Sequence, residues 1–282
     1  MASTRTTYTK YHEKMISLLK QCDDGWLTFI PDSVFETYSR YLKKTVEKNS
    51  EFKLYRYCGL YYFDDNSNQM KFSLDLEKLR FSSNGSLNDI FEGLPNSDYS
   101  MYSIEKCINK LSKTAYIKCF TETYQNNLMW AHYADSHKGV CIEYDIKRID
   151  EESIIDNFFP VVYSKKRDVF VSEELLIDYF NGEKELDATR DAKGIFLKKA
   201  DCWKYEKEWR ACIMNVDNES ASHIEISFPY VSAIYIGART SQEDIERIKS
   251  KVAEFTDKYK CPIELYKMKL NETTYDLETF KL

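Results

Sequence analysis

The spacing of apolar residues predicts two helices at the start of the chain. Within residues 11–22, four apolar side chains recur at the spacing of one helical face, and a second helical pattern runs through residues 32–48. Aspartate and serine at the start of the second pattern can cap a helix, because their side-chain oxygens accept hydrogen bonds from free backbone N–H groups. We expect these helices to form an N-terminal helical appendage over residues 1–50, followed by one domain over residues 51–282.

After residue 50 the pattern changes to short apolar runs mixed with further helical segments. Ser241 and Asp244 have the spacing of a capping box at the start of one of these helices. Strands and helices that do not alternate regularly are typical of an α+β fold. The predicted strands are 53–57, 79–82, 116–120, 140–144, 161–163, 209–214, 224–226, 231–236 and 262–268, and the predicted helices are 102–111, 128–134, 173–180, 186–199 and 241–258.

Two glutamates lie two residues apart where one predicted strand begins. Glu206, Glu208 and Arg210 would share one face of that strand, since alternate side chains of a strand point the same way. Two neighbouring carboxylates repel each other and raise each other's pKa, which is useful mainly at a functional site. We expect this pair to be the chemical centre. The simpler alternative is a solvated strand edge whose carboxylates pair with surface lysines.

Two other segments carry side chains suited to a nucleotide. Arg56 lies inside an aromatic strand, and a planar guanidinium can bind a pyrophosphate with two hydrogen bonds. Thr121 and Thr123 end an apolar strand, where two hydroxyls on one face can support a ribose or a carboxylate. A carboxylate pair can stabilise an oxocarbenium-like sugar carbon. Each segment alone also fits an ordinary surface or strand role, so the hypothesis of a dinucleotide glycosyl site rests on their combination.

The order of these segments resembles the arginine–serine–glutamate signature of mono-ADP-ribosyltransferases. The resemblance implies an ADP-ribosyltransferase-like α+β fold, in which small mixed sheets flank a cleft and helices surround them. It implies that NAD is the substrate, that Arg56 binds its pyrophosphate, and that Thr121 and Thr123 steady its nicotinamide ribose. Glu208 would stabilise the cationic sugar, and Glu206 would position or deprotonate the acceptor. The chain departs from the signature in having threonine at both hydroxyl positions, with an acidic residue between them.

The resemblance leaves the acceptor of the ADP-ribose open. The acceptor would be a protein, a nucleic acid or, in a NAD glycohydrolase, water. By analogy with such enzymes, a bacterial toxin or an antiphage defence effector is a natural role, and a regulatory partner or a homo-oligomer is compatible with it.

Further polar and aromatic residues are candidates for contacts with NAD. Asn88 would line the cleft, Tyr57 follows the strand arginine, and His132 could hydrogen-bond a ribose or a phosphate. Trp130 and Tyr133 could stack on the nicotinamide or adenine ring, although packing in the core is the commoner role for such side chains. The second histidine nearby lies five residues after the first, which is not the spacing of two metal ligands on one helix. The sequence therefore predicts no metal site among these residues.

A longer series of motifs resembles a widespread bacterial family that is catalogued as domain of unknown function 2971. The series covers roughly residues 54–237, and the two predicted N-terminal helices fall outside it. The resemblance implies a bacterial or phage-related origin and no established activity. Its motifs include Leu54-Tyr55-Arg56-Tyr57, Leu87-Asn88-Asp89-Ile90-Phe91-Glu92, Cys119-Phe120-Thr121-Glu122, Met129-Trp130-Ala131-His132-Tyr133 and Trp203-Lys204-Tyr205-Glu206-Lys207-Glu208-Trp209-Arg210.

Two other classes of function fit the same residues. In a metal-dependent hydrolase of nucleic acids, Asp89, Glu92, Glu206 and Glu208 would hold Mg²⁺ through their carboxylate oxygens. Such an enzyme would need metal and would not respond to NAD. A non-catalytic regulatory module would instead bind a nucleotide or a protein in an aromatic cleft, without turnover.

Composition and charge narrow these classes. The net charge of −6, from 40 basic and 46 acidic residues, gives no electrostatic reason for nonspecific binding to nucleic acid. The 8 cysteines include no Cys-x-x-Cys pair, so we expect free thiols in a reducing compartment. No apolar run approaches the about 20 residues of a membrane helix, and the polar first ten residues do not resemble a signal peptide. We expect a cytoplasmic protein without a membrane partner.

Overall fold

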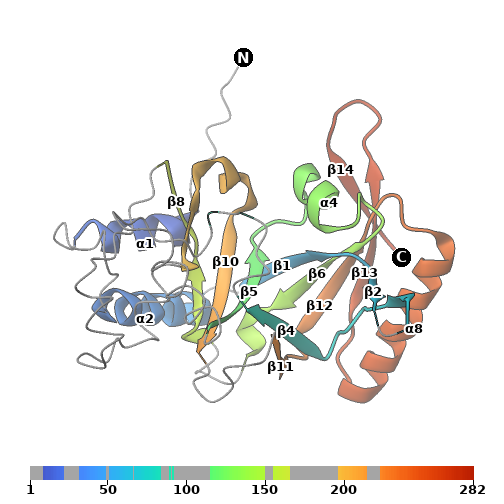
Figure 1. Cartoon of the computed structure of the whole chain (residues 1–282), viewed down its shortest axis with the longest axis horizontal. Helices are drawn as coiled ribbons and strands as arrows, with labels where there is room; N and C mark the ends of the chain where they lie inside the picture. The colour runs from blue at the N-terminus through green and yellow to red at the C-terminus, as the bar shows by residue number, and fades with distance from the viewer. Residues whose placement is uncertain are drawn as a thin grey trace. The chain divides into compact units, whose positions relative to one another are not determined.

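The computed structural model describes most of the chain and divides it into two compact units. The described residues are 9–21, 32–48, 51–65, 67–83, 89, 91, 115–149, 155–165, 196–214 and 223–282. Unit 1 comprises residues 1–48, 80–119 and 151–224, and unit 2 comprises residues 49–79, 120–150 and 225–282. Helices and strands occur together in both units (Figure 1), which confirms the predicted mixed α+β class.

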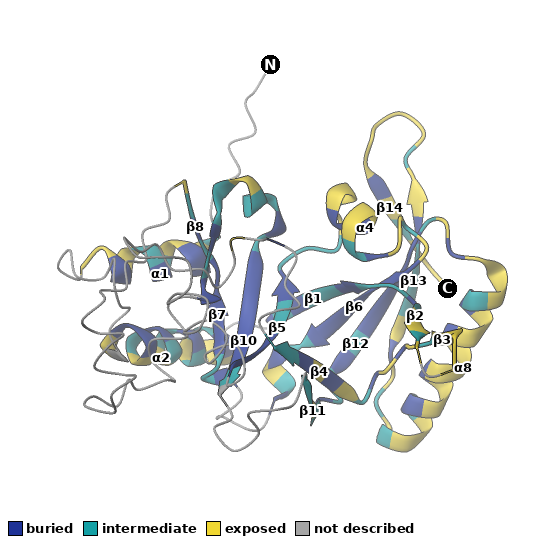
Figure 2. Ribbon diagram, in the orientation of Figure 1, coloured by how far each residue is buried: buried dark blue, intermediate teal, exposed yellow. Residues whose placement is uncertain are grey.

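Unit 1 is built around the long strand β10 (Glu208–Met214). This strand pairs with β7 (Phe158–Pro160) on one side and with β5 (Ala115–Thr121) on the other. β5 in turn pairs with β4 (Lys78–Ser83), and the short strands β8 (Val162–Ser164) and β9 (Lys198–Ala200) form a separate parallel pair. The residues of β10 are mostly buried (Figure 2), so this strand lies in the core of unit 1.

The two predicted N-terminal helices are present and pack on this core. They are α1 (Lys10–Leu19) and α2 (Asp32–Lys48). Tyr11 of α1 meets Trp209 of β10 edge to face, with ring centroids 5.3 Å apart, and Phe35 of α2 meets Phe159 of β7 at 5.0 Å. The predicted boundary near residue 50 stays a prediction, but the first 48 residues share a compact unit with segments from the middle of the chain.

In unit 2, five strands lie next to one another in a larger mixed sheet. Their order is β1 (Lys53–Cys58), β6 (Val140–Asp145), β12 (Val231–Ile236), β13 (Glu264–Leu270) and β14 (Leu277–Lys281), and only the β12–β13 pair is parallel. The helix α8 (Gln242–Tyr259) begins at the predicted capping box, where the Ser241 hydroxyl accepts a hydrogen bond from the backbone N–H of Asp244 at 3.1 Å. The smaller elements of unit 2 are the hairpin β2 (Tyr61–Asp64) and β3 (Gln69–Phe72), the helix α4 (Asn127–Tyr133) and the 3-10 turn η3 (Ile146–Arg148).

Several predicted elements differ from the structure or lie outside it. The predicted strand at 161–163 is present as β8 and begins one residue later. Of the helix predicted over 186–199, residues 186–195 lie outside the described residues, and its last two residues belong to the strand β9. The hairpin β2–β3 and the strand β14 were not predicted, because their residues are largely exposed and carry weak apolar patterns. The predicted helices 102–111 and 173–180 lie outside the described residues.

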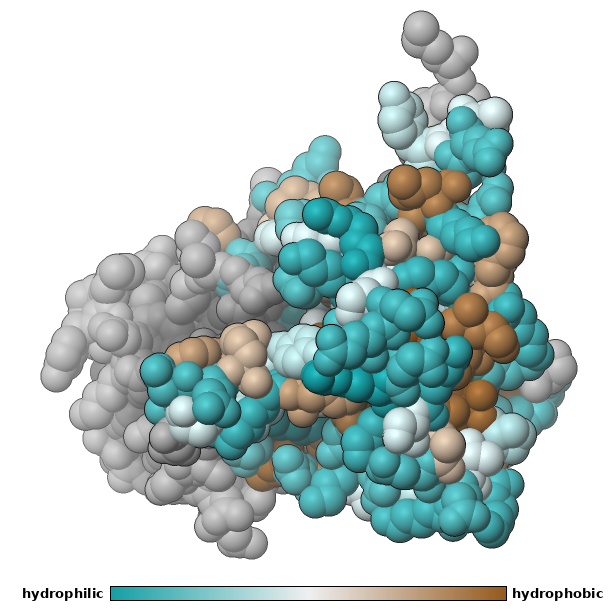
Figure 3. Space-filling model, turned by 90° about the vertical axis from the view of Figure 1, so that its right-hand side faces the viewer, coloured by the Kyte–Doolittle hydropathy of each residue, from teal (hydrophilic) through white to brown (hydrophobic). Residues whose placement is uncertain are grey.

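The surface of the chain is mixed in character. The face drawn in Figure 3 is mostly hydrophilic, with separate hydrophobic patches among the hydrophilic ones. On β13 and β14, Leu270 and Phe280 are exposed apolar side chains. In the described part of the chain, no helix combines the length and the apolar composition needed to cross a membrane.

Replacing Gly139 with alanine is expected to destabilise unit 2 by about 1–3 kcal/mol. A Cβ atom at this position would lie 2.2 Å from the backbone oxygen of Cys58, so one of the two backbones would have to move. Gly59→Ala is the matched control, since its Cβ atom would come no closer than 3.7 Å to a neighbour, at Asp135. Urea denaturation of both variants measures the difference, and equal midpoints would contradict the expected close approach.

Candidate functional site

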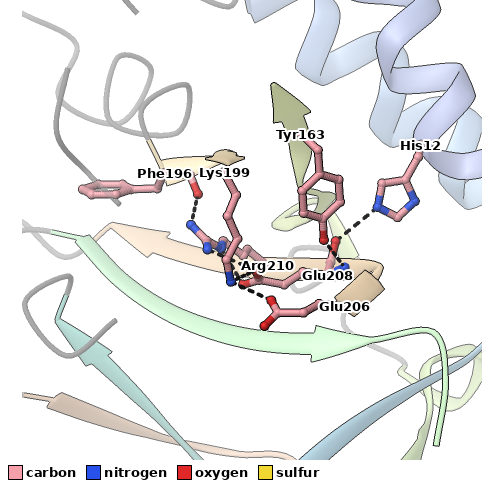
Figure 4. Close-up of polar contacts among 7 residues, drawn as sticks. All are labelled: His12, Tyr163, Phe196, Lys199, Glu206, Glu208 and Arg210. Atoms are coloured by element: carbon pink, nitrogen blue, oxygen red, sulfur yellow. Dashed lines mark hydrogen bonds and ion pairs between the residues drawn. The ribbon is translucent and has the colours of Figure 1, made fainter. Parts of the chain in front are cut away.

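Four charged side chains form a buried cluster in unit 1. They are Lys199 of β9, Glu206 at the end of the 3-10 helix η4 (Asp201–Glu206), and Glu208 and Arg210 of β10. The side chains are between 0% and 6% exposed, so water has almost no access to any of the four charges. Ionised groups are costly to bury unless each one is paired, and Figure 4 shows how the four pair with one another.

Lys199 joins the two carboxylates. Its ammonium Nζ lies 2.6 Å from Oε2 of Glu206 and 2.8 Å from Oε2 of Glu208. Arg210 donates to both oxygens of Glu208, from Nε to Oε1 at 2.7 Å and from a terminal nitrogen to Oε2 at 3.2 Å. The other terminal nitrogen of Arg210 donates to the backbone oxygen of Phe196. The predicted proximity of Glu208 and Arg210 is therefore observed, within a cluster of two positive and two negative charges.

The two carboxylates meet because the chain turns sharply between them. The helix η4 ends at Glu206, Lys207 has a left-handed backbone with φ 46° and ψ 48°, and β10 begins at Glu208. The prediction that both glutamates lie on one strand is therefore wrong. Alternation of side chains along a strand explains only why Glu208 and Arg210 point to the same side of β10. It does not explain the position of Glu206.

The pKa of Glu208 moves in the direction opposite to the prediction. Burial by itself would raise the pKa of this carboxyl, but the charges and hydrogen bonds of Arg210 and Lys199 outweigh burial and lower it to about 2. The sequence-based expectation considered only the repulsion between two carboxylates and missed the buried cations. Glu208 is therefore ionised throughout the neutral pH range.

The backbone of Glu208 is held as firmly as its side chain. Its N–H donates to the Tyr163 hydroxyl at 2.7 Å, and its carbonyl oxygen accepts from the N–H of Val161 at 2.9 Å. His12 of α1 lies 3.3 Å from the same oxygen through Nε2, which must be the donor because a carbonyl oxygen can only accept (Figure 4). Contacts from β8 and α1 thus fix the start of β10, which positions the carboxylate of Glu208.

The arrangement of the cluster suits the binding of positive charge. Two carboxylates direct one oxygen each at a single point, and the ammonium of Lys199 occupies that point. The same ammonium lies 5.0 Å from the ring centroid of Trp203, within the range of a cation–π contact. The carboxylates of Glu206 and Glu208 thus form a rigid pair that is shielded from water, and the cation that they bind is the ammonium of Lys199.

The remaining predicted site residues that are described belong to unit 2. Arg56 and Tyr57 are neighbours on β1 and therefore point to opposite faces of the sheet. Tyr57 packs edge to face on Trp130, with ring centroids 5.1 Å apart. On the Arg56 side, burial raises the pKa of the Tyr144 phenol, and the nearby charge of Arg56 partly offsets this rise. The structure therefore groups Tyr57 with Trp130 and places Arg56 on the other side of the sheet.

The two threonines form hydrogen-bonded turns after β5. The Thr121 hydroxyl accepts from the N–H of Thr123 at 3.3 Å, and the Thr123 hydroxyl accepts from the N–H of Gln125 at 3.1 Å. Each hydroxyl supports the local backbone, and the predicted contact of these threonines with a ribose stays a prediction.

The aromatic and histidine candidates near α4 differ in exposure. Trp130 is fully buried and donates from Nε1 to the backbone oxygen of Tyr124 at 2.8 Å. His132 is exposed and Tyr133 is partly exposed, with their ring centroids 6.2 Å apart. Asn88 lies outside the described residues.

The carboxylate set of the predicted metal-dependent hydrolase is described only in part. Glu92 lies outside the described residues. Within the described ranges, no three histidine, cysteine, aspartate or glutamate side chains gather closely enough to hold a metal ion.

Sequence reasoning missed two members of this site. Lys199 lies near the glutamate strand in sequence, where a solvated lysine is the simpler expectation, yet the structure buries it between the glutamates. His12 lies in the first predicted helix, and its position in the sequence gave no sign of a contact with β10. The available signal for Lys199 was charge balance, since two buried carboxylates beside a single arginine require a second cation.

The comparison with known proteins supports one of the two resemblances. Residues 129–211 match the family described as a protein of unknown function (DUF2971). The four charged residues of the cluster all lie within this range. No curated protein and no solved structure matches the chain.

Proposed function

We propose that the chain consumes NAD, as a mono-ADP-ribosyltransferase or a NAD glycohydrolase with an ADP-ribosyltransferase-like fold, and that its carboxylate pair stabilises the developing sugar cation. The observation that carries this proposal is the convergence of Glu206 and Glu208 on one positive group, at 2.6 and 2.8 Å. A site that holds a cation so closely in a desolvated setting also suits a carbon that becomes positively charged.

The low pKa of Glu208 supports this role. A carboxylate can stabilise a cationic sugar only while it is ionised, and the pKa of about 2 keeps Glu208 ionised at every physiological pH. Arg210 contributes by fixing the orientation of the carboxylate through two hydrogen bonds. Preorganised charge of this kind needs little rearrangement during the reaction.

In this mechanism the side chain of Lys199 must move out from between the two carboxylates. Its ammonium lies where the ribose would contact the carboxylates, so substrate binding requires the lysine to move. The Trp203 ring offers a neighbouring contact for the displaced ammonium, since cation–π attraction can replace part of the lost ion pairing.

The reaction follows from the charges. The bond between the ribose C1′ and the nicotinamide nitrogen breaks, both electrons go to nicotinamide, and nicotinamide leaves as a neutral molecule. The acceptor, which is water or an O–H or N–H group of a macromolecule, then forms a bond to C1′ and loses its proton. We assign this proton to Glu206 and the stabilisation of C1′ to Glu208. The contributions of Arg56, Thr121 and Thr123 stay predictions.

A second candidate is a non-catalytic nucleotide-binding or protein-binding module. Its specific support is the mutual neutralisation of the four charges, which is also the arrangement of a purely structural ion cluster. This candidate predicts binding of NAD or a partner without release of nicotinamide.

Glu208→Gln is expected to reduce nicotinamide release from labelled NAD about 100-fold or more, because the variant loses the charge that faces C1′. The Glu206→Gln variant keeps the Arg210–Glu208 pair. We expect this variant still to release nicotinamide but no longer to transfer the label to an acceptor. The assay measures both signals with and without a chelator, which should have no effect.

Glu243→Gln is the matched control, because Glu243 is an exposed partner in a helical ion pair. Circular dichroism and the urea midpoint establish that each variant is folded. Release of nicotinamide by Glu208→Gln at the wild-type rate would contradict the proposal. Saturable binding of NAD with no turnover by the wild type would favour the binding module.

A further inference from the structure

A group of tyrosines covers one face of the sheet in unit 2. Tyr55 of β1 lies opposite Glu143 of β6 in the strand register, and Tyr235 of β12 lies opposite Tyr266 of β13. Residues directly opposite each other in a sheet point to the same side. Tyr124, which follows β5, stacks on Tyr235 from outside the sheet. None of these four tyrosines was among the predicted site residues.

Three of these rings form a parallel column. The ring centroids of Tyr124 and Tyr235 are 4.0 Å apart with an interplanar angle of 12°, and those of Tyr235 and Tyr266 are 5.1 Å apart at 13°. Tyr55 leans against the column at 5.4 Å from Tyr124 and 6.1 Å from Tyr235. Tyr235 is the central ring, and Tyr124 and Tyr266 are the two ends.

Two glutamates hold the rings in place by accepting hydrogen bonds from the tyrosine hydroxyls. The Tyr235 hydroxyl donates to Glu143 at 2.9 Å, and the Tyr266 hydroxyl donates to Glu264 at 2.6 Å. Glu143 also accepts from Ser232 at 2.7 Å and pairs with the ammonium of Lys53 at 2.9 Å. The rings are therefore fixed in orientation before any ligand arrives, which reduces the entropy lost on binding.

The parallel geometry differs from that of the buried core of the same unit. Core rings there meet edge to face: Tyr57 and Trp130 at 89°, Phe120 and Tyr144 at 88°. The central ring Tyr235 is 7% exposed, whereas the end rings Tyr124 and Tyr266 are only partly buried. Among the described residues, Tyr235 is the one ring that contacts Tyr266. On the other side of Tyr266, the next strand places Lys281 opposite it on the same side of the sheet, and the Lys281 ammonium pairs with Glu264 at 2.6 Å.

We propose that this tyrosine column binds a flat nitrogen heterocycle, a nucleobase, which stacks on its end at Tyr266 after the side chain of Lys281 moves aside. That side chain is 63% exposed, and an exposed ion pair such as the one between Lys281 and Glu264 holds it only weakly. A column of parallel rings extends most favourably by another flat ring, because offset stacking is a preferred arrangement of π-systems. Cages for quaternary ammonium groups instead surround the cation with several aromatic faces, and grooves for proline-rich peptides use rings that stand apart. Stacking of a base on an aromatic side chain contributes about 1–3 kcal/mol, a useful part of a nucleotide's affinity.

The site is independent of the proposed NAD chemistry. It lies wholly within unit 2, whereas the carboxylate cluster lies within unit 1. The ligand is identified only by its base, so the site would accept a free nucleoside, a nucleotide or the base of a nucleic acid.

Titration of the full chain with adenosine, followed by tyrosine fluorescence and by NMR saturation transfer, tests the proposal. We expect saturable binding, with transfer to the base protons, and no binding of ribose, which lacks the base. Tyr266→Leu should weaken adenosine binding about 5- to 150-fold, because the stacking surface is lost. Tyr266→Phe should bind adenosine nearly as well as the wild type, since it retains the ring.

Tyr62→Leu is the matched control, because Tyr62 is 49% exposed on β2, outside the column. The proposal is overturned if adenosine shows no saturable binding, if ribose binds equally well, or if Tyr266→Leu binds adenosine as tightly as Tyr62→Leu does. Adenosine contains no nicotinamide, so the adenosine titration tests the column separately from the NAD assay. Either proposal can therefore fail without the other.

Discussion

Replacing Arg210 with methionine is expected to lower the free energy of unfolding by about 3–5 kcal/mol. The guanidinium is 0% exposed and makes two hydrogen bonds to Glu208 and one to the backbone oxygen of Phe196. Methionine fills a similar volume without charge, so the variant leaves Glu208 with Lys199 as its main cation. Urea denaturation at neutral pH measures the loss.

Two further variants show whether this effect comes from buried charge. Lys251→Met breaks an exposed ion pair with Glu254 between adjacent turns of α8, and we expect a change of no more than about 0.5 kcal/mol. The double variant Arg210→Met with Glu208→Leu should recover a large part of the lost stability, because no isolated carboxylate stays buried beside the methionine. If the double variant is less stable than Arg210→Met, the loss comes from packing and not from an uncompensated charge.

Acidification is expected to remove on the order of 3 kcal/mol of stability through Glu208 alone. The folded-state pKa is about 2, below the ordinary value of 4.5. A lowered carboxyl pKa means that the unfolded chain binds the proton more readily. The contribution is therefore fully present above pH 4.5 and is lost as the pH falls towards 2.

Comparison of the wild type with Glu208→Gln isolates this contribution. Between pH 6 and pH 3 we expect the unfolding free energy of the wild type to fall by on the order of 2 kcal/mol more than that of the variant. Other carboxylates titrate in both proteins and cancel in the difference. Equal pH dependence of the two proteins would show that Glu208 is not held ionised by its neighbours.

The strands and helices with strong apolar patterns could be predicted from the sequence. α1, α2 and α8 follow the helical period, because one side of each helix faces a core. The central strands β6 and β12 are instead short apolar runs that are buried on both faces. β2 and β3 carry Tyr62, Phe63 and Met70 as exposed side chains, so burial did not shape their pattern. β9 escaped prediction because its three residues follow a segment with helical periodicity and pair only with β8.

The candidate site shows a different limit of sequence reasoning. Glu208 and Arg210 are neighbours on a strand, so local geometry was sufficient to place them together. Lys199 and His12 reach the same point from β9 and α1, and their positions depend on tertiary packing. The sign of the pKa shift of Glu208 depended on those partners as well. Residue spacing along the chain was enough to predict where charged side chains gather. Predicting the ionisation of Glu208 also required knowing which partners the fold brings to it.

The left-handed backbone of Lys207 has a consequence for how this segment can change during evolution. Its φ of 46° costs most residue types about 1–2 kcal/mol, but glycine and asparagine adopt it readily. Lys207 itself is partly exposed and lies between two buried glutamates. Relatives that retain the turn should therefore exchange lysine for glycine or asparagine freely at this position, whereas β-branched residues should be absent from it. The residue type at the middle position of the Glu-x-Glu motif would then depend on the backbone shape of the turn. The flanking glutamates would depend on the charge that the buried cluster requires.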